Sequence, residues 1–221
     1  MKKKIALTVA SLFLMSSMAF AAPMTEYEAG KISIDLTFRG SKNSTDWSGG
    51  FKENFDRKYN FEPSITVGVA EGLAVQFRNT NAKSKNTNPV NILGESGTSK
   101  IRANEFNVLY SVAPNASVFV GYVNSKVTNN YDDFGFEYSV EGKNNTYQLG
   151  VLGSMPFSDR FSGYGVLAIG GKSWRNYELG VSYGLSDDMD FNVSYRHIES
   201  NFVNADVKAK GFGFGITYRF N

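Results

Sequence analysis

The stretch Gly211-Phe212-Gly213-Phe214-Gly215-Ile216-Thr217-Tyr218-Arg219-Phe220, just before the final Asn221, decides the fold class. Successive side chains of an extended strand point to opposite faces, so one face here is large and apolar and the other is small or polar. A strand of a soluble domain turns its apolar face toward a core. A strand of a transmembrane barrel turns it toward lipid instead. The alternation alone fits both kinds of strand, so other features of the chain must distinguish a soluble domain from a transmembrane barrel.

The first 21 residues have the features of a secretory signal peptide. Three lysines follow Met1, an apolar run extends from Ile5 to Phe20, and Ala19-Phe20-Ala21 forms a small-x-small cleavage site. We expect cleavage after Ala21, which leaves residues 22–221 as one domain. Loss of the three lysines changes the formal net charge from +2 to −1. The exported chain then has no basic excess that would favour nucleic acid as a partner.

Composition narrows the fold to two classes. The chain has no cysteine, which excludes a disulfide framework and thiolate metal sites, and we expect no metal or cofactor. After the signal peptide no apolar run approaches the roughly 20 residues that a membrane helix needs. An exported chain rich in Tyr, Phe, Gly and Asn is therefore either a secreted all-β domain or an outer-membrane barrel.

Ten alternating runs follow the signal peptide, and long and short connections between them alternate along the chain. The runs are Ile32–Arg39, Tyr59–Ala70, Leu73–Arg78, Glu105–Val112, Val118–Tyr122, Thr146–Val151, Tyr164–Ala168, Tyr177–Leu185, Phe191–Arg196 and Gly211–Phe220. The first, third and fifth connections are long and polar, whereas the even-numbered connections are short turns. Long loops at one end and short turns at the other are typical of outer-membrane barrels. We predict an all-β, antiparallel, up-and-down transmembrane barrel of ten strands, with eight as the alternative.

Two segments are ambiguous in this assignment. In the seventh run we assign the apolar outer face to Tyr164, Val166 and Ala168, although Leu167 and Ile169 on the other face are also apolar. The second segment, Phe134 to Val140, also alternates and is a candidate eleventh strand. We interpret it as a hairpin that extends the third outer loop, because bacterial single-chain barrels have even strand numbers.

The second half of the chain resembles a known group of membrane proteins. The resemblance is carried by Gly163-Tyr164-Gly165, by Tyr177 to Phe191, by Val193-Ser194-Tyr195-Arg196 and by Gly215 to Phe220. These residues are similar to the small outer-membrane β-barrel families related to the OmpA transmembrane domain and the opacity proteins. The resemblance implies residence in a bacterial outer membrane and insertion by the barrel-assembly machinery. It says little about function, because such a fold carries many.

The inward parity of the strands collects a polar set that we expect to line the interior: Asp35, Arg39, Glu62, Gln76, Arg78, Glu105, Gln148, Glu178, Arg196 and Arg219. Such residues could line a selective channel, or they could pair with one another and close the barrel. Small barrels fill their interiors with side chains, and buried charges need partners, so we favour the closed interior.

His197 is the single histidine, and any enzymatic interpretation must use it. Arg196-His197-Ile198-Glu199-Ser200 superficially resembles the His/Ser/Glu set of an outer-membrane lipid hydrolase. Alternation places Ser200 on the face opposite His197, so a hydrogen bond between base and nucleophile would need a bulge. We therefore expect no catalytic residues and no enzyme.

Lys208 and Lys210 share the outward parity of the last strand, and across its hairpin they should lie near His197. These three residues could contact phosphates of lipopolysaccharide, or the lysines could simply extend their amines toward water. We expect the outer-membrane lipids, including lipopolysaccharide, as partners of a monomeric barrel.

The leading functional prediction is a structural or surface-exposed barrel that at most passes small solutes weakly and passively. The first alternative is an adhesin or ligand receptor that acts through the loops Gly40–Lys58, Asn79–Lys100 and Thr128–Asn145. The second alternative is a lipid-modifying enzyme.

Overall fold

The computed structural model describes residues 23–90, 95–133, 135–171, 174–202 and 204–220. These residues form ten strands: β1 (Ile32–Trp47), β2 (Lys52–Ala70), β3 (Leu73–Lys83), β4 (Ser96–Ala113), β5 (Ala116–Asp133), β6 (Phe136–Pro156), β7 (Phe161–Gly170), β8 (Trp174–Gly184), β9 (Met189–Phe202) and β10 (Ala205–Phe220). No helix in this part of the chain is long and apolar enough to cross a bilayer. The predicted signal peptide lies outside the described residues.

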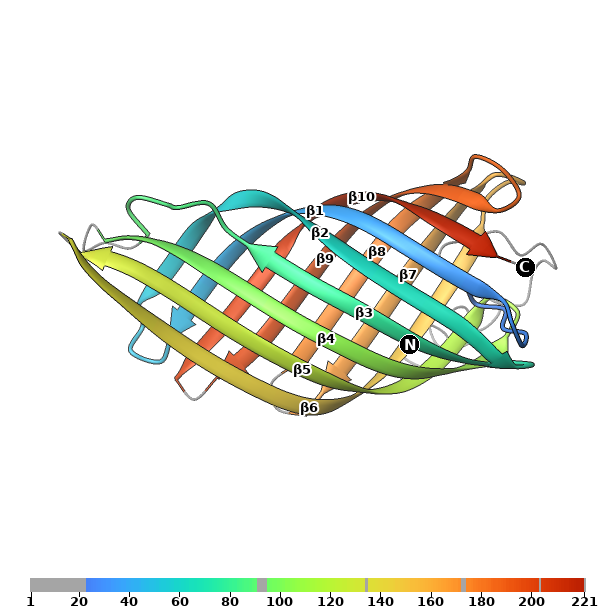
Figure 1. Ribbon diagram of the computed structural model, residues 1–221, viewed down its shortest axis with the longest axis horizontal. Helices are drawn as coiled ribbons and strands as arrows, with labels where there is room; N and C mark the ends of the chain where they lie inside the picture. The colour runs from blue at the N-terminus through green and yellow to red at the C-terminus, as the bar shows by residue number, and fades with distance from the viewer. Residues whose placement is uncertain (1–22, 91–94, 134, 172–173, 203, 221) are drawn as a thin grey trace, which may run out of the picture.

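Each strand pairs with its neighbours in the chain, and β1 pairs with β10 to close the barrel. All ten pairings are antiparallel, and the start of β1 and the end of β10 lie at the same end of the molecule (Figure 1). The prediction of a ten-stranded, antiparallel, up-and-down barrel is confirmed. The apolar stretch of β10 faces outward, with Phe212 and Phe214 among its exposed side chains.

Two of the three long segments predicted to be loops, Gly40–Lys58 and Thr128–Asn145, are mostly strand, and for them that prediction is wrong. In Gly40–Lys58 only residues 48–51 lie between β1 and β2. In Thr128–Asn145 only residues 134 and 135 lie between β5 and β6. The segment Asn79–Lys100 keeps a longer connection, residues 84–95. These segments were predicted to be loops because they are polar. A strand pair above the bilayer forms its backbone hydrogen bonds between its own strands, so it needs no apolar outer face.

In the strand extensions the apolar side chains lie on the inward face, whereas lower on the same strands they lie on the outward face. On β5, the outward residues Val118, Val120 and Tyr122 are exposed. Higher on the same strand, Val127 and Tyr131 are buried inside the barrel. The strand keeps its register, so the apolar residues change parity where the surroundings change from lipid to water. Outward apolar side chains on this strand therefore end at Tyr122, and the outward residues above it are polar.

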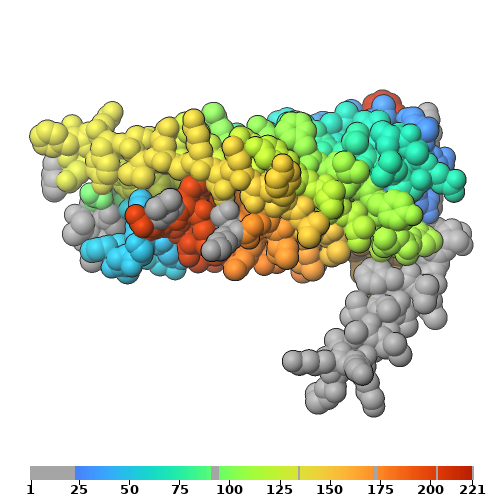
Figure 2. Space-filling model, turned by 90° about the horizontal axis from the view of Figure 1, so that it is seen from below, coloured from blue at the N-terminus to red at the C-terminus, as the bar shows by residue number. Residues whose placement is uncertain are grey.

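The candidate eleventh strand is the upper part of β6, so its interpretation as a hairpin extension is confirmed for the described residues. Asp133 pairs with Phe136 at the top of the β5–β6 ladder, which projects beyond the other strands (Figures 1 and 2). The partner on the other side, β7, pairs with β6 only from Gln148 to Pro156. The upper part of β6 therefore has one free edge, and residues 136–141 are exposed on both faces.

The ambiguous seventh strand is settled by burial. Val166 and Ala168 are buried inside the barrel, whereas Leu167 and Ile169 are exposed on its outer surface. The prediction that Val166 and Ala168 belong to the apolar outer face is therefore wrong. When both faces of a strand are apolar, the sequence pattern does not show which face points outward. Here the pairing of β7 with β6 and β8 determines it.

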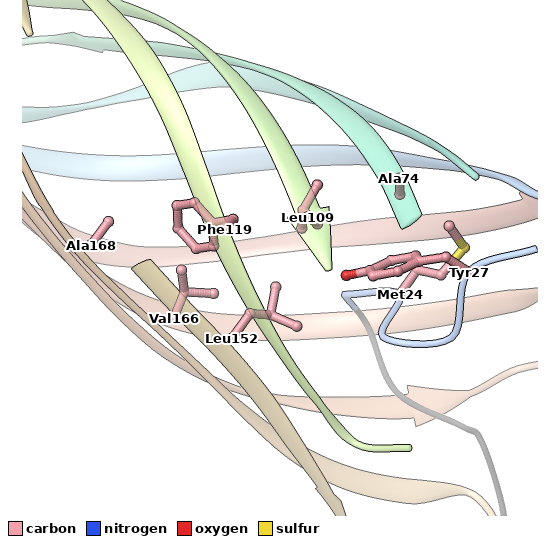
Figure 3. Close-up of a cluster of buried hydrophobic side chains, with 8 residues drawn as sticks. All are labelled: Met24, Tyr27, Ala74, Leu109, Phe119, Leu152, Val166 and Ala168. Atoms are coloured by element: carbon pink, nitrogen blue, oxygen red, sulfur yellow. The ribbon is translucent and has the colours of Figure 1, made fainter. Parts of the chain in front are cut away.

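The segment before β1, residues 23–31, folds into the end of the barrel at which β1 begins and β10 ends. Met24 and Tyr27 pack in an apolar cluster with inward side chains of five strands (Figure 3), namely Ala74, Leu109, Phe119, Leu152, Val166 and Ala168. The hydroxyl of Tyr27 donates a hydrogen bond to the Ser117 Oγ at 2.9 Å. The backbone N–H of Gly72 donates to the carbonyl of Tyr27 at 2.9 Å. The segment thus belongs to the packed interior.

Candidate functional site

Six ionisable side chains from six strands meet inside the barrel, and we call this set the charged layer. Its members are Arg39 on β1, Glu62 on β2, Arg78 on β3, Glu105 on β4, Glu178 on β8 and Arg196 on β9. Strand register brings them to one level, because Arg78 pairs directly with Glu105 and Glu178 pairs directly with Arg196. Three positive and three negative groups leave the charged layer neutral.

Arg196 is the centre of the charged layer. Its Nη2 donates to the Glu105 Oε1 at 2.8 Å, and its Nη1 lies 3.4 Å from the Glu62 Oε2. Its Nε donates to the Asn176 Oδ1 at 2.9 Å, and Nη1 also donates to Thr80. The Arg196 residue is 2% exposed. A planar guanidinium with five donors can serve several acceptors at once, which a lysine could not do.

Glu178 is held by the other two arginines. Its Oε1 accepts from the Arg39 Nη2 at 2.8 Å, and its Oε2 lies 3.3 Å from the Arg78 Nη1. Arg39 also donates through Nε to the Glu62 Oε2 at 3.0 Å, while the hydroxyl of Ser194 donates to the Glu178 Oε1. Each acid therefore contacts at least one arginine, as buried charges require.

A chain of amides continues the charged layer toward the opposite wall. The Gln148 Nε2 donates to Glu105 at 3.1 Å and to the Asn107 Oδ1 at 2.7 Å. Asn107 in turn donates to the Gln76 Oε1 at 3.0 Å. Gln148 also accepts from the indole N–H of Trp174 at 3.0 Å. Polar contacts thus run from β9 through β4 and β6 to β3 and β8.

All ten residues expected to line the interior lie on the inward face, but Asp35 and Arg219 stand apart from the charged layer. Asp35 accepts a hydrogen bond from Thr217 at 2.5 Å, and Arg219 pairs with Asp190 near the end of β10. Sequence reasoning missed Asp190, although it shares the inward parity of Arg196 on β9. That parity could have identified it.

Apolar clusters lie in the interior above the charged layer, among buried polar side chains such as Asn43, Ser125 and Asn129. Trp174, Ile198, Val123 and Ala103 pack together, and a second cluster lies higher: Ala82, Ile101, Val127, Val207 and Ala209, with Phe202 against it. With the cluster around Tyr27 at the other end, the charged layer lies between two apolar layers. These apolar layers were also missed, because the interior was expected to be polar throughout.

His197 lies on the outer surface, away from the charged layer. Its ring is 6.2 Å from that of Tyr177, and it pairs across the ladder with Lys210. Ser200 is fully buried on the opposite face of β9. The structure therefore does not bring His197 and Ser200 together.

Lys208 and Lys210 lie on the outer face of β10, and Lys208 is neutralised by its neighbour. Its Nζ lies 2.7 Å from the Asp46 Oδ2, and this contact raises the pKa of Lys208 and lowers that of Asp46. His197, Lys208 and Lys210 are close in register. However, one of the two lysine charges is already paired.

The family profile described as outer membrane protein beta-barrel domain matches residues 7–220. The chain belongs to this outer-membrane β-barrel family. Its place is accordingly the bacterial outer membrane, with the apolar outer face in lipid. No curated protein sequence matches the chain.

Solved structures share the fold of this family member at low sequence identity. The outer membrane protease OmpT of Escherichia coli is 13% identical with a TM-score of 0.58, over 93% of this chain and 99% of that one. Ail, the attachment invasion locus protein of Yersinia pestis, is 12% identical with a TM-score of 0.52, over 87% and 99%. The translocator domain of the autotransporter NalP of Neisseria meningitidis is 9% identical with a TM-score of 0.51, over 99% and 94%. A protease, an attachment protein and a translocator share this architecture, so the fold alone does not specify a role.

Proposed function

We propose that this outer-membrane barrel is a closed, monomeric protein with a structural role at the cell surface, and that it conducts no solutes through its interior. The observation that carries the proposal is the layered filling of the barrel. The charged layer pairs Arg39, Glu178 and Arg196 with neighbours at 2.8–3.4 Å, and apolar clusters cover it on both sides. A wet channel needs charged groups that face water, whereas the charges of this layer pair with one another.

Planar-bilayer recording of the refolded chain tests the closed interior. We expect no stable openings above the empty-bilayer baseline, because passage would require separation of at least four ion pairs within the charged layer. Heat-modifiable gel mobility of the same sample would show that the barrel is folded. Large, stable openings from folded protein would contradict a closed interior and favour the weak passive pore.

A second candidate function, adhesion or ligand capture at the cell surface, is favoured by the β5–β6 extension. The hairpin rises beyond the other strands and exposes Phe136 at 79% and Tyr138 at 45%. Exposed aromatic side chains on a projecting element are typical of an interaction surface. Tyr131 and Tyr138 stack with ring centroids 4.9 Å apart, and the Tyr138 hydroxyl donates to Glu95, which supports the hairpin from the neighbouring loop.

Shortening the hairpin in register tests adhesion. Thr128 pairs with Glu141, so deletion of residues 129–140 with a two-residue Asn-Gly turn in their place preserves the ladder below. If the hairpin is the adhesive element, cells displaying the shortened barrel should lose attachment to host cells while the gel shift persists. Undiminished attachment would exclude the hairpin as the adhesive element. Deletion of the exposed residues 48–51 with the same turn serves as the control.

We also propose that the barrel has no catalytic activity. His197 contacts Tyr177 on the outer surface, and the neighbouring hydroxyl of Ser200 is buried on the other side of the strand. A base and a nucleophile on opposite faces of one strand cannot exchange a proton directly.

A further inference from the structure

Three cations form a row across the outer surface of β4, β5 and β6, and we call it the cation row. Arg102 pairs across the ladder with Lys126, and Lys126 pairs with Lys143. All three side chains have outward parity. Each stands four residues above an exposed aromatic residue of its own strand, namely Phe106, Tyr122 and Tyr147.

The height of the cation row matches the lipid headgroups. Outward aromatic side chains mark the membrane interface in barrels, so Phe106, Tyr122 and Tyr147 define that level here. Four residues span about 13 Å along a strand, which is about 10 Å of height at a tilt of roughly 40°. The flexible stems of Lys126 and Lys143 can cover the remaining distance to the phosphate level.

The cation row lacks matching negative charge. Like charges directly opposite each other on a ladder destabilise it, and the row contains two such pairs. Among the described residues, the one acidic group in contact with it is Glu141, 2.7 Å from the Lys126 Nζ. Lys83 and Lys100 form another like-charged pair beside it. Burial, followed by the charges of Arg102, Lys83 and Lys58, lowers the pKa of Lys100.

The opposite wall of the barrel shows the contrasting arrangement. There, Lys208 and Lys52 both contact Asp46, at 2.7 and 3.4 Å, and Arg175 contacts Glu199 at 3.6 Å. Lys52, Lys208 and Arg175 thus have anions from this chain, whereas Lys42 lies opposite Lys210 on the ladder. On the β4–β6 wall, three cations stand side by side on adjacent strands with Glu141 as the carboxylate in contact, and an anion from outside the chain would relieve their repulsion.

An apolar hollow lies on the outer wall directly below the cation row. It has a volume of about 690 Å³ and crosses β4 to β7, with Val108, Val120, Tyr122, Tyr147, Leu149 and Ile169 in its lining. A second hollow of about 650 Å³ shares Val108, Val120, Leu149 and Ile169 and extends the same depression to Tyr110 and Val151. Together they form a groove along the lipid-facing wall, wide enough for an acyl chain.

We propose that the β4–β6 wall is a binding site for a phosphorylated glycolipid of the outer leaflet. The phosphates contact Arg102, Lys126 and Lys143, and an acyl chain occupies the groove below. A lipid fits better than a soluble polyanion, because the charge and the groove are continuous on one wall and meet at the membrane interface. This site is independent of the closed interior and lies on a different wall from His197, Lys208 and Lys210.

Binding of lipid A to the refolded barrel tests the site. The barrel in zwitterionic detergent is titrated with diphosphorylated lipid A and with the same lipid after removal of its phosphates, and bound lipid is counted by native mass spectrometry. The triple variant Arg102→Gln/Lys126→Gln/Lys143→Gln should bind the diphosphorylated lipid roughly tenfold more weakly. The control Lys52→Gln/Arg175→Gln removes two paired charges from the opposite wall and should bind like the parent chain.

Thermal unfolding provides a second measurement, in which the cation-row variant should be at least as stable as the parent chain without lipid A, although it binds lipid A more weakly. Without lipid A the cation-row variant should melt at the same temperature as the parent chain or higher, because like-charge repulsion is gone. With diphosphorylated lipid A the parent chain should gain more stability than the variant. This comparison excludes misfolding as the cause of weaker binding.

Three results would overturn the proposal. Equal binding by the parent chain and the cation-row variant would show that these three cations do not bind the phosphates. An equal loss in the opposite-wall control would make the effect one of net charge. Binding of inorganic pyrophosphate or of a sulfated polysaccharide that depends on the cation row, with lipid A unaffected by phosphate removal, would assign the row to a soluble anion.

Discussion

Replacing Arg196 with methionine should lower the free energy of unfolding by about 3–5 kcal/mol. Arg196 contacts Glu105 at 2.8 Å and Glu62 at 3.4 Å, and its Nε lies 3.9 Å from Glu178. Methionine fills similar space but leaves Glu105 without an arginine within ion-pair distance in a buried site. Removal of one partner of a buried pair costs more than the pair contributes, because the remaining charge keeps its desolvation penalty. Urea titration of the barrel refolded into lipid vesicles measures the change.

Two further variants make the Arg196 result specific. Arg196→Lys keeps the charge but cannot reach all the acceptors, so its loss should be intermediate. Arg175→Gln removes an arginine whose side chain is 57% exposed and paired with Glu199 at 3.6 Å, and it should cost at most about 1 kcal/mol. A loss below about 1 kcal/mol for Arg196→Met would show that the charged layer contributes little to holding the barrel closed.

Trp174→Ala is expected to cost about 3–5 kcal/mol, the usual range for removal of a buried tryptophan. Trp174 is 1% exposed and packs against Val123 and Ile198. Its indole N–H is also a donor to Gln148 at 3.0 Å. The variant therefore opens a cavity at the tip of the β7–β8 hairpin and removes one hydrogen bond from the amide chain next to the charged layer.

The chain offers a matched control for Trp174, since it contains two tryptophans. Trp47 ends β1 and is only partly buried, so Trp47→Ala should cost about 1 kcal/mol or less. Each variant keeps the other tryptophan as a fluorescence probe of unfolding by urea. Equal losses in the two variants would mean that the interior above the charged layer is loosely packed.

The strands that cross the membrane were predictable because lipid imposes a simple rule. On β10, Phe212 and Phe214 alternate with glycines, and outward apolar residues mark a lipid-facing strand wherever they occur. The extensions above the membrane follow the opposite rule, with Val127 and Tyr131 inside. Because only the rule for lipid-facing strands was applied, those residues were predicted to be loop. The predicted strands β1, β2, β5 and β6 were therefore too short at their outer ends.

The charged layer was predictable only in part. Parity placed Arg39, Glu178 and Arg196 inside, but parity does not show height along the barrel. Height depends on the stagger between strands, which pairs Glu178 with Arg196 and Arg78 with Glu105. The cation row escaped notice for the same reason, since its three members come from segments 17 residues apart or more.

The amino-acid sequence by itself determined the barrel class, the number of strands and, outside the seventh strand, which residues face inward in the membrane, because strand periodicity is local and lipid selects one phase. Only the tertiary structure decided which charges pair, how completely the interior is filled and where cations gather on the wall. Those properties depend on register between strands that are distant in the chain. Backbone hydrogen bonding and packing fix that register together, and no single strand encodes it.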